Sequence, residues 1–356
     1  MGAKIKIAIV GASGYTGIEL IKILDNHEKA DVKYVTSRTY SGKKVKEVLP
    51  MTLSLKNNSE ISFIDEIKEE NINNVNVIFL CLPPGKSMQY ILRIKDAFKG
   101  KIIDLGADFR IKDGKEYEKW YGNTHTLKEL LPEFTYGLCE IKRDEIKKAR
   151  YIANPGCYPT SVLLALAPIL KNGNYRIDSI NIDSKSGVSG AGKKLAEDYL
   201  FLNIFDNFYA YSATSHRHIP EMEQEISDMS GKQMSICFTP HLLPVNRGIF
   251  STIYLNLKKD THLGNLENNL YEYYNDLYKA EIFVHFLGEK IPKLKDVVGT
   301  NNIQIGFLFD KRTSTLKIFS ALDNILKGAS GQAVQNMNIM FGFKEDEGLR
   351  LNGINN

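Results

Sequence analysis

The fold is indicated by the start of the chain, where an apolar strand pattern runs into a glycine-rich turn. The stretch reads Ile5-Lys6-Ile7-Ala8-Ile9-Val10 and then Gly11-Ala12-Ser13-Gly14-Tyr15-Thr16-Gly17. Glycines three residues apart permit a tight turn, and a helix that begins there presents unpaired N–H groups to a pyrophosphate. A simple glycine turn is the alternative, but the order strand, turn, helix favours a dinucleotide site. We predict cofactor contacts at Gly11, Ser13, Gly14, Tyr15, Thr16 and Gly17.

The same alternation of short strands and helices continues to about residue 152. Strand patterns cover residues 5–10, 32–36, 75–82, 101–105 and 151–153, and helix patterns cover 15–24, 87–98 and 142–149. Short apolar strands separated by amphipathic helices are typical of a parallel sheet that is covered on both faces. We therefore predict an α/β fold in which residues 1–152 form a doubly wound, Rossmann-type nucleotide-binding domain.

The sequence changes character after residue 152. Longer strand patterns follow at 177–183, 233–239, 248–257, 282–285, 303–310 and 315–321, with few helices between them. This pattern predicts a second α+β domain, residues 153–327, with a mostly antiparallel sheet. A helix pattern at 332–341 follows a glycine-rich break at 328–331, and we expect the segment from about 328 to 356 to pack back on the first domain.

Composition and charge exclude several classes of protein. The 356 residues are 43% hydrophobic and 25% charged, and 46 basic against 42 acidic residues give a net charge of only +4. This excess is too small to indicate a nucleic-acid partner. The start of the chain lacks a signal-peptide pattern, and no apolar run is long enough to cross a membrane. The four cysteines, at 81, 139, 157 and 237, are widely spaced and indicate neither disulfides nor a zinc site. We expect a cytoplasmic protein with a small anionic ligand.

The end of the second strand indicates which dinucleotide is bound. NAD sites carry an acidic residue about 20 residues beyond the turn, where it binds the ribose hydroxyls. This chain has Ser37-Arg38 at that point and no carboxylate. A hydroxyl and a guanidinium suit the 2′-phosphate of NADP, so we predict NADP, contacted by Ser37 and Arg38. A solvated surface arginine is the alternative.

A reactive cysteine is indicated by Asn154-Pro155-Gly156-Cys157-Tyr158-Pro159-Thr160. Pro155-Gly156 forms a turn and Pro159 suits the first turn of a helix, so Cys157 lies near a helix N-terminus. The helix dipole there stabilises a thiolate, the form that attacks an activated acyl group. A small buried cysteine is the alternative, and it is the better interpretation of Cys81.

Several ordered motifs together resemble the N-acetyl-gamma-glutamyl-phosphate reductases of arginine biosynthesis, and more widely the aspartate-semialdehyde dehydrogenases. The motifs are 11–17, 104–110, 154–160, 186–192, 216–221, 244–248 and 331–337. The resemblance implies that the Cys157 thiolate attacks an acyl phosphate and releases phosphate. NADPH then reduces the thioester, and the thiohemiacetal collapses to an aldehyde.

The acid/base group is expected in His216-Arg217-His218-Ile219-Pro220-Glu221, which opens a helix running to Ser227. One imidazole near Cys157 would take the thiol proton and later protonate the hemiacetal oxygen. The sequence leaves open whether His216 or His218 does this, with His216 the first candidate. A metal pair completed by His241 or Glu221 is the alternative, but no motif supports it and we predict no metal.

Further contacts follow from the resemblance. Arg110 lies just past a strand and is expected to hold the substrate phosphate, although pairing with Asp108 or Asp113 is the alternative. The segment Gly187–Lys194 nearly matches a P-loop, but Lys194 replaces the required hydroxyl residue, so a nucleotidase is doubtful. Pro83 stands where many members carry histidine. The added cofactor contacts are Pro83, Ser189, Gly190, Asn324 and Gln332, and the added substrate contacts are Arg110, Asn154, Lys193 and Arg247.

Two rival functions remain at the level of sequence. A sister reductase of lysine biosynthesis, acting on a carrier-bound aminoadipyl phosphate, shares these motifs and differs in its substrate pocket. A non-catalytic NADP-binding regulator would keep the fold with an unreactive Cys157. The sheet of the second domain also offers a face for self-association, and we expect a homo-oligomer, a dimer or a tetramer.

Overall fold

The N-terminal strand and its glycine turn lead into a seven-stranded sheet in which every neighbouring pair is parallel. The strands are β1 (Ile5–Val10), β2 (Ala30–Thr36), β3 (Phe63–Ile64), β4 (Val77–Leu80), β5 (Lys101–Asp104), β6 (Phe134–Tyr136) and β7 (Tyr151–Ala153). Their order is β3-β2-β1-β4-β5-β7-β6. This computed structural model describes residues 4–172, 175–193, 196–258, 266–351 and 353.

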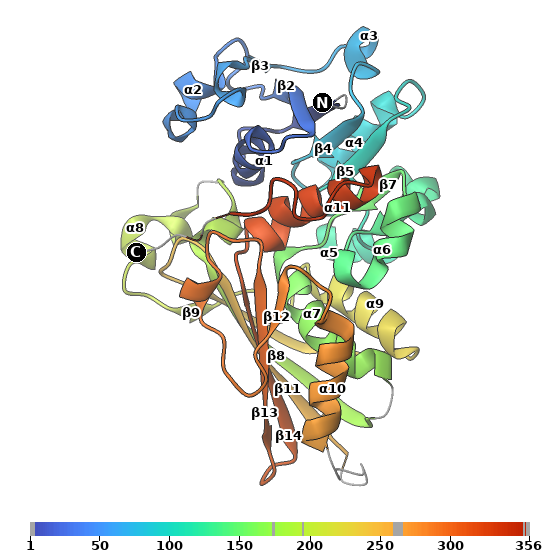
Figure 1. The fold of residues 1–356 in the computed structure, drawn as a ribbon, viewed down its shortest axis with the longest axis vertical. Helices are drawn as coiled ribbons and strands as arrows, with labels where there is room; N and C mark the ends of the chain where they lie inside the picture. Colours follow the sequence, from blue (N-terminus) through green and yellow to red (C-terminus); the bar gives the residue numbers. More distant parts are fainter. Residues whose placement is uncertain (1–3, 173–174, 194–195, 259–265, 352, 354–356) are drawn as a thin grey trace. The chain divides into compact units, whose positions relative to one another are not determined.

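Helices accompany this sheet and account for its apolar strands. They are α1 (Tyr15–Asp25), α2 (Val45–Val48), α3 (Glu69–Ile72), α4 (Lys86–Ile94), α5 (Gly114–Tyr121), α6 (Cys139–Lys148) and α11 (Gly331–Phe341), as Figure 1 shows. All four residues of β4 are buried, as expected for a central strand covered on both faces. The doubly wound parallel sheet predicted from the sequence is confirmed.

A second seven-stranded sheet is mixed and mostly antiparallel, also as predicted. It contains β8 (Ile177–Gly187), β9 (Tyr209–Ala210), β10 (Cys237–Leu243), β11 (Ile249–Leu257), β12 (Val284–Phe286), β13 (Ile303–Asp310) and β14 (Thr315–Leu322). The order is β12-β13-β14-β11-β8-β10-β9. Only the pairs β8–β10 and β12–β13 are parallel.

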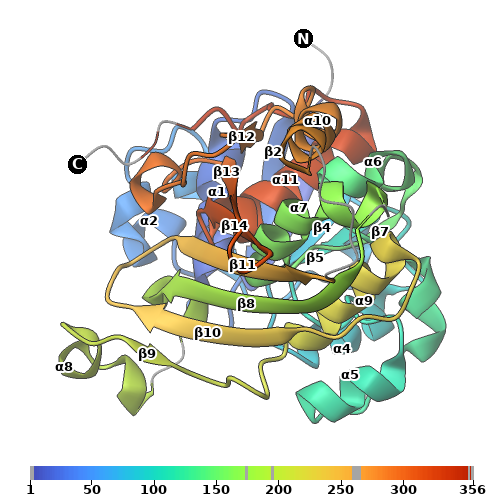
Figure 2. The same cartoon turned by 90° about the horizontal axis from the view of Figure 1, so that it is seen from below.

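Helix α7 (Cys157–Asn172) forms the core of this second part and carries Cys157 at its start. Every residue of α7 from Tyr158 to Leu170 is buried, and α9 (Ile219–Ser230) and α10 (Leu266–Tyr278) pack beside it (Figure 2). The Oγ atom of Ser161 lies 3.0 Å from that of Ser251 on β11 and 2.7 Å from that of Ser320 on β14. These hydroxyls fix the position of the helix on the sheet.

The chain divides into two compact units. The first contains Met1–Pro155 with Ala329–Arg350, so the segment that carries α11 belongs to it. The second contains Gly156–Gly328 and also Leu351, so the chain beyond Arg350 does not belong to the first unit. Each unit holds one of the two sheets. In the described part of the chain, no helix is both long enough and apolar enough to cross a membrane.

Several elements differ from the prediction, and β3, β6 and α5 in the first unit were not predicted. The strand expected at 233–239 begins only at Cys237, because α9 continues to Ser230 and ends at Gly231 with φ of +68°. Helix α10 was not predicted, although Leu266, Leu270, Tyr274 and Tyr278 form a buried stripe at a spacing of four residues. Its composition, rich in asparagine and tyrosine, hides this stripe.

Candidate active site and cofactor turn

The glycine turn after β1 is required by packing at two of its three glycines. Gly11 has φ of +80°, and a Cβ atom there would lie 2.4 Å from the carbonyl oxygen of Cys81. A Cβ atom on Gly17 would lie 2.5 Å from Cα of Ala12, whereas one on Gly14 would meet nothing closer than 3.6 Å. Helix α1 starts at Tyr15 directly after Gly14, and the partial positive charge of a helix N-terminus favours an anion there.

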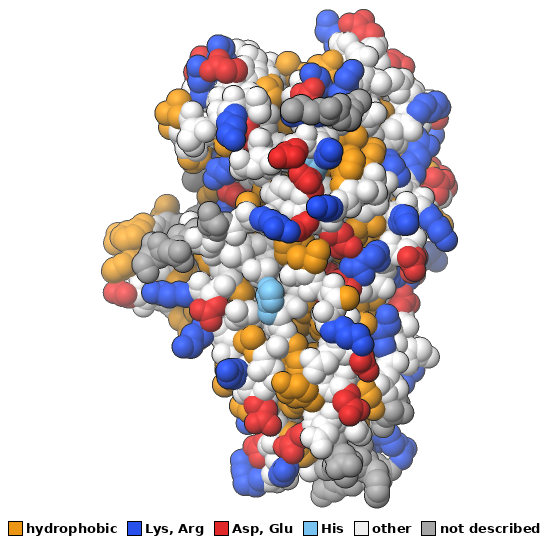
Figure 3. Space-filling view, viewed as in Figure 1, with side chains coloured by type: hydrophobic (Ala, Val, Ile, Leu, Met, Phe, Trp, Pro, Cys, Tyr) orange, Lys and Arg blue, Asp and Glu red, His pale blue; other side chains and the backbone are white. Residues whose placement is uncertain are grey.

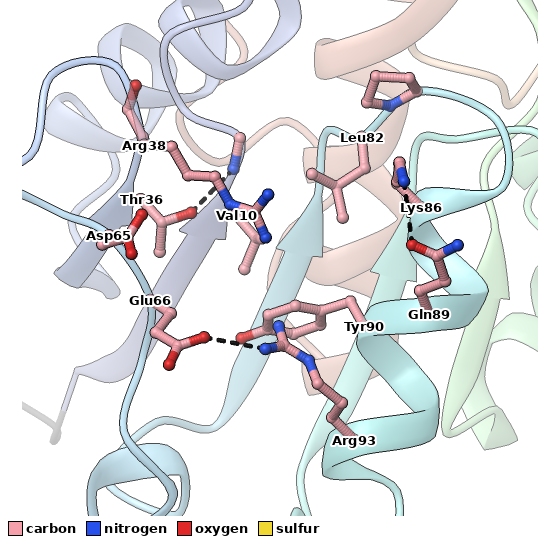
Figure 4. A pocket seen from close by; sticks show the side chains of 13 residues that line it. Val10, Thr36, Arg38, Asp65, Glu66, Leu82, Lys86, Gln89, Tyr90 and Arg93 are labelled. Atoms are coloured by element: carbon pink, nitrogen blue, oxygen red, sulfur yellow. Dashed lines mark hydrogen bonds and ion pairs between the residues drawn. The ribbon is translucent and has the colours of Figure 1, made fainter.

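A cavity of about 480 Å³ lies beside this turn, within the first unit. It is formed by the ends of β1, β2 and β4, the start of α4 and the loop after β3 (Figure 4). Cavities of this size hold small-molecule ligands and cofactors. Of the predicted contacts, Gly11, Ser37, Arg38 and Pro83 line it. Ser13 joins them because its Oγ atom lies 3.0 Å from Oγ of Ser37.

The charges around this cavity are mixed. Arg38 extends into it from the end of β2, and Lys86 and Arg93 line it from α4 (Figure 4). Two carboxylates, those of Asp65 and Glu66, line it as well. The Arg93 guanidinium donates to Glu66 at 2.9 Å, so one of these carboxylates is already paired with a cation. Among the other charged side chains that line the cavity, the two cations Arg38 and Lys86 outnumber the single carboxylate of Asp65, which suits an anionic ligand near Arg38.

Buried polar groups underlie the same sheet edge. Asp104 ends β5, is fully buried and accepts hydrogen bonds from Ser87 Oγ and Gly106 N at 2.7 and 2.8 Å. Burial, reinforced by the nearby Asp108 carboxylate, raises the pKa of Asp104 to about 7. Asp108 accepts from Tyr117 Oη and from two backbone N–H groups, those of Gly85 and Met88. These bonds fix the loop between β4 and α4.

The predicted nucleophile lies at a helix start, as expected. Cys157 is the first residue of α7 and is half-buried. The preceding Gly156 N–H donates to Oε1 of Glu221 at 2.8 Å, and the Thr160 hydroxyl donates to the Gly156 carbonyl at 2.9 Å. A Cβ atom on Gly328 would lie 2.8 Å from Cβ of Cys157, so only glycine allows this close approach. The partial positive charge of the helix N-terminus favours a thiolate here.

The other three cysteines lie in different surroundings. Burial raises the pKa of Cys81 to about 12, which agrees with its interpretation as an apolar strand residue. Cys139 is buried and donates to Oδ1 of Asn336 at 3.2 Å. Cys237 is exposed at the start of β10. Of the four thiols, only that of Cys157 combines partial burial with a helix N-terminus.

His216 lies in an aromatic cluster close in space to the residue after Cys157. Its ring centroid is 5.3 Å from that of Tyr158, 5.7 Å from that of Tyr211 and 5.4 Å from that of Phe238. Burial, together with the positive charge of Arg217, lowers the pKa of His216 to about 4. The ring is therefore neutral at physiological pH.

The backbone selects one tautomer of this ring. The His218 N–H donates to Nδ1 of His216 at 3.1 Å, so the single ring proton of His216 lies on Nε2. The His218 ring is 4.9 Å from that of His216 and 6.0 Å from that of Tyr158. Helix α9 begins at Ile219, and Pro220 lies in its first turn as predicted. Both candidate histidines thus belong to one cluster with Tyr158.

The residues predicted to hold substrate fall into two groups. In the first unit, Arg110 donates from Nε to the Asn154 carbonyl and from Nη2 to the Leu105 carbonyl, each at 2.8 Å. Asn154 is fully buried, and its Oδ1 atom accepts from Asn336 at 3.1 Å. In the second unit, Arg247 lies 3.5 Å from the buried Asp323, and Lys193 is exposed. Lys194, the last residue of the P-loop-like segment, lies outside the described residues.

The remaining predicted cofactor contacts are also divided between the units. Asn324 accepts from the Gly248 N–H at 2.7 Å and donates to Ser189 Oγ at 3.0 Å, and Gly190 lies beside this pair. Gln332 is the second residue of α11, in the first unit, and donates to the Gly137 carbonyl at 2.9 Å. It is fully buried, and within the described residues its Oε1 atom has no hydrogen-bond partner. Such an atom suits a ligand donor.

Several residues of these sites were not predicted. Tyr158 and Tyr211 share a hydrogen bond of 3.0 Å between their hydroxyl oxygens, and burial raises both pKa values. The fully buried Lys327 precedes Gly328, and its Nζ atom lies 5.6 Å from the Phe283 ring centroid. The aromatic repeat 208–211 was the available signal for Tyr211. Among the described residues, no three His, Cys, Asp or Glu side chains are grouped so that they could hold a metal.

Comparison with protein families matches both units. Residues 6–149 match the family model of the semialdehyde dehydrogenase NAD binding domain, and residues 157–324 match that of the semialdehyde dehydrogenase dimerisation domain. The first unit is thus similar to domains that bind a nicotinamide dinucleotide.

Curated relatives and solved structures are consistent with these matches. An N-acetyl-gamma-glutamyl-phosphate reductase of Pelotomaculum thermopropionicum is 46% identical, with 98% of this chain and 99% of that protein covered. A reductase of the same name from Caldicellulosiruptor bescii is 47% identical, with 98% of this chain and 99% of that protein covered. A Vibrio cholerae aspartate semialdehyde dehydrogenase II structure has a TM-score of 0.70 at 17% identity, covering 96% of this chain and 99% of that chain. A Candida albicans aspartate semialdehyde dehydrogenase structure with NADP has a TM-score of 0.65 at 15% identity, covering 95% and 99%.

Proposed function

Because the chain belongs to the N-acetyl-gamma-glutamyl-phosphate reductase family, we propose that it reduces N-acetyl-glutamyl 5-phosphate to N-acetyl-glutamate 5-semialdehyde and phosphate. This is a step in which an activated carboxyl group becomes an aldehyde, as in arginine biosynthesis. The observation that carries the proposal is Cys157 at the first residue of α7, with its neighbour Tyr158 in one cluster with both histidines.

Cys157 is the nucleophile in this reaction. Its thiolate attacks the acyl carbon, and the bond to the phosphate oxygen breaks, so that phosphate leaves and a thioester forms on sulfur. When bound, the reduced nicotinamide supplies hydride to the thioester carbon. The resulting thiohemiacetal then loses the Cys157 sulfur and releases the aldehyde. The location of Cys157 at the α7 N-terminus supports this role because the helix dipole stabilises the thiolate.

The two histidines divide the proton transfers. The hydrogen bond from the His218 N–H to Nδ1 assigns the proton of the neutral His216 ring to Nε2, so Nε2 donates a hydrogen bond to the acyl oxygen as negative charge develops there. Nδ1 of His216 already accepts from the His218 backbone, which prevents it from taking the thiol proton. We therefore assign to His218 the removal of the thiol proton and the return of a proton on product release.

The first unit binds the cofactor, and we propose NADP. The glycine turn and the α1 N-terminus hold the pyrophosphate, and Arg38 with Ser37 holds the 2′-phosphate. The cavity beside Arg38 supports this assignment. The buried Gln332, whose Oε1 atom has no partner among the described residues, supports a contact with the carboxamide N–H of the nicotinamide. The other residues expected from the resemblance, Asn324, Ser189 and Gly190, lie together in the second unit.

The second unit is catalytic, and it is also the oligomerisation unit. The match of residues 157–324 to a dimerisation domain supports a homo-oligomer. Large apolar side chains are also gathered over α8 (Phe201–Ile204), where Phe201 and Leu202 are 71% and 85% exposed (Figure 3). Exposed apolar clusters of this kind mark association surfaces. A reducing compartment, the cytoplasm, suits an enzyme whose nucleophile must remain a free thiol.

The test is NADPH oxidation by the purified protein with N-acetyl-glutamyl phosphate, with the Cys157→Ser variant beside it. The expected result is turnover by the native protein and none measurable by the variant. Aminoadipyl phosphate on its carrier is the second substrate in the assay. Preference for that substrate would overturn the proposed specificity, and no turnover of either, with NADPH still bound, would indicate a regulator instead.

A further inference from the structure

A second cavity, of about 200 Å³, lies within the second unit and was not predicted from the sequence. Its walls come from the end of β8, the segment 198–211, β10 and the loop before α9. The volume corresponds to roughly six or seven water molecules. It therefore has room for the end of a small molecule of comparable heavy-atom number.

This cavity lies next to the proposed nucleophile. His216 and Tyr211 both line it. The Tyr211 hydroxyl is hydrogen-bonded to that of Tyr158, the residue after Cys157. Burial raises the pKa of Tyr211, and the electrostatic effect of Cys157 acts in the same direction. A molecule in this cavity would thus have its other end near the sulfur.

The cavity carries one guanidinium and one carboxylate. Arg217 lines it, and the charge of Arg217 contributes to the lowered pKa of His216, after the larger effect of burial. Asp198 lines it from the facing segment. A guanidinium binds a carboxylate through paired hydrogen bonds, and a carboxylate accepts a hydrogen bond from an amide N–H. The two charges are complementary to a ligand end with an anionic carboxylate and an amide.

Aromatic and apolar groups complete the walls. Tyr199 and Tyr209 line the cavity, and the Tyr209 hydroxyl donates to the Asp198 carbonyl at 3.3 Å, which fixes one wall. Leu242 of β10 adds an apolar surface. Such walls favour a small apolar substituent such as the methyl of an acyl group over a hydrated ammonium ion.

We propose that this cavity receives the N-acyl amino-acid end of the substrate, with Arg217 binding its carboxylate and Tyr199 and Tyr209 contacting its acyl group. The inference rests on the proposed function and specifies how the substrate is selected. It assigns substrate binding to Arg217, a residue distinct from Arg110, Asn154, Lys193 and Arg247, the substrate contacts predicted from the sequence.

The kinetic test is the reverse reaction, in which the semialdehyde and inorganic phosphate are varied separately. Arg217→Met is expected to raise KM for the semialdehyde about tenfold or more and to leave KM for phosphate within about twofold. Arg217→Lys keeps the charge and is expected to recover part of the loss. If KM for phosphate rises instead, or if neither KM changes, the proposal is wrong.

A second readout does not require turnover. Iodoacetate and iodoacetamide alkylate a thiolate by the same reaction, and only iodoacetate is charged. A change in the ratio of their rates at Cys157 between native protein and a variant therefore reports on nearby cations. Arg217→Met is expected to lower the iodoacetate-to-iodoacetamide ratio about tenfold. Lys185→Met is the matched control, since Lys185 belongs to the same unit but pairs with Asp183 at 2.7 Å outside the cavity. An unchanged iodoacetate-to-iodoacetamide ratio in Arg217→Met would overturn the proposal. If the ratio falls in Arg217→Met as expected but native protein shows no turnover, only the proposed function is overturned.

Discussion

The neutral, half-buried His216 ring has a measurable consequence for stability. Burial lowers its pKa from 6.5 to about 4 in the folded protein, while in the unfolded chain the ring titrates normally. Between these two pH values the unfolded chain binds a proton that the folded protein does not bind. The folded state therefore loses stability as the pH falls from 6.5 to about 4, and this contribution does not change above pH 6.5.

The magnitude follows from the difference of 2.5 pH units between the two pKa values. At about 1.4 kcal/mol per unit, the full effect is about 3 kcal/mol, and about 2 kcal/mol of it is already lost at pH 5. The His216→Asn variant lacks the titrating ring. Urea unfolding of both proteins at pH 7.5 and pH 5 should show the native protein losing about 2 kcal/mol more than the variant.

A matched control is His285→Asn, because His285 is exposed on β12 and its removal changes no buried ring. The stability change of this variant between the two pH values is the reference against which that of His216→Asn is compared. If His216→Asn shows a constant difference from native protein, within about 0.5 kcal/mol, the ring is solvated in the folded protein. The neutral tautomer assigned to it would then be wrong.

Three further predictions concern the first unit. Gly17→Ala should cost roughly 1–3 kcal/mol in urea unfolding, because its Cβ atom would lie 2.5 Å from Ala12 Cα, and Gly14→Ala, with its nearest atom at 3.6 Å, should cost less. Arg38→Ser should weaken NADPH binding about tenfold or more by fluorescence titration and leave NADH binding nearly unchanged, and equal losses would contradict the 2′-phosphate assignment. The pKa of Asp104 is raised from 3.8 to about 7, so the folded protein loses stability as the pH rises between these values. The free energy of unfolding of Asp104→Asn should therefore increase relative to that of native protein between pH 4.5 and pH 7.5. If the difference in the free energy of unfolding between variant and native protein is the same at both pH values, the Asp104 carboxyl is already ionised at pH 4.5.

The parts of the fold that depend on local sequence were predictable. The strand Ile5–Val10, the turn and the start of α1 follow from apolar periodicity and glycine spacing, and the structure has the same bounds at the start of each element. The place of Cys157 at a helix start follows from Pro155-Gly156 before it and Pro159 after it. Neighbouring residues determine these features, so one short segment is enough to recognise them.

The surroundings of the site depend on residues far apart in the chain and could not be predicted. The lowered pKa of His216 follows from burial among Tyr158, Tyr211 and Phe238, which come from three separate segments of the chain. The carbonyl partners of Arg110 come from Leu105 and from the distant Asn154. A motif shows which residue types are present, and only the packed structure shows which groups surround them.

The central claim is that Cys157 carries the acyl group between phosphate release and reduction. The most direct measurement is intact-mass and peptide mass spectrometry of the protein mixed with N-acetyl-glutamyl phosphate in the absence of NADPH. The account predicts one N-acetyl-glutamyl group on the peptide that contains Cys157, removed as semialdehyde when NADPH is added, and no adduct on Cys157→Ser. Turnover by native protein with no acyl group on Cys157, or an adduct that NADPH does not discharge, would contradict it.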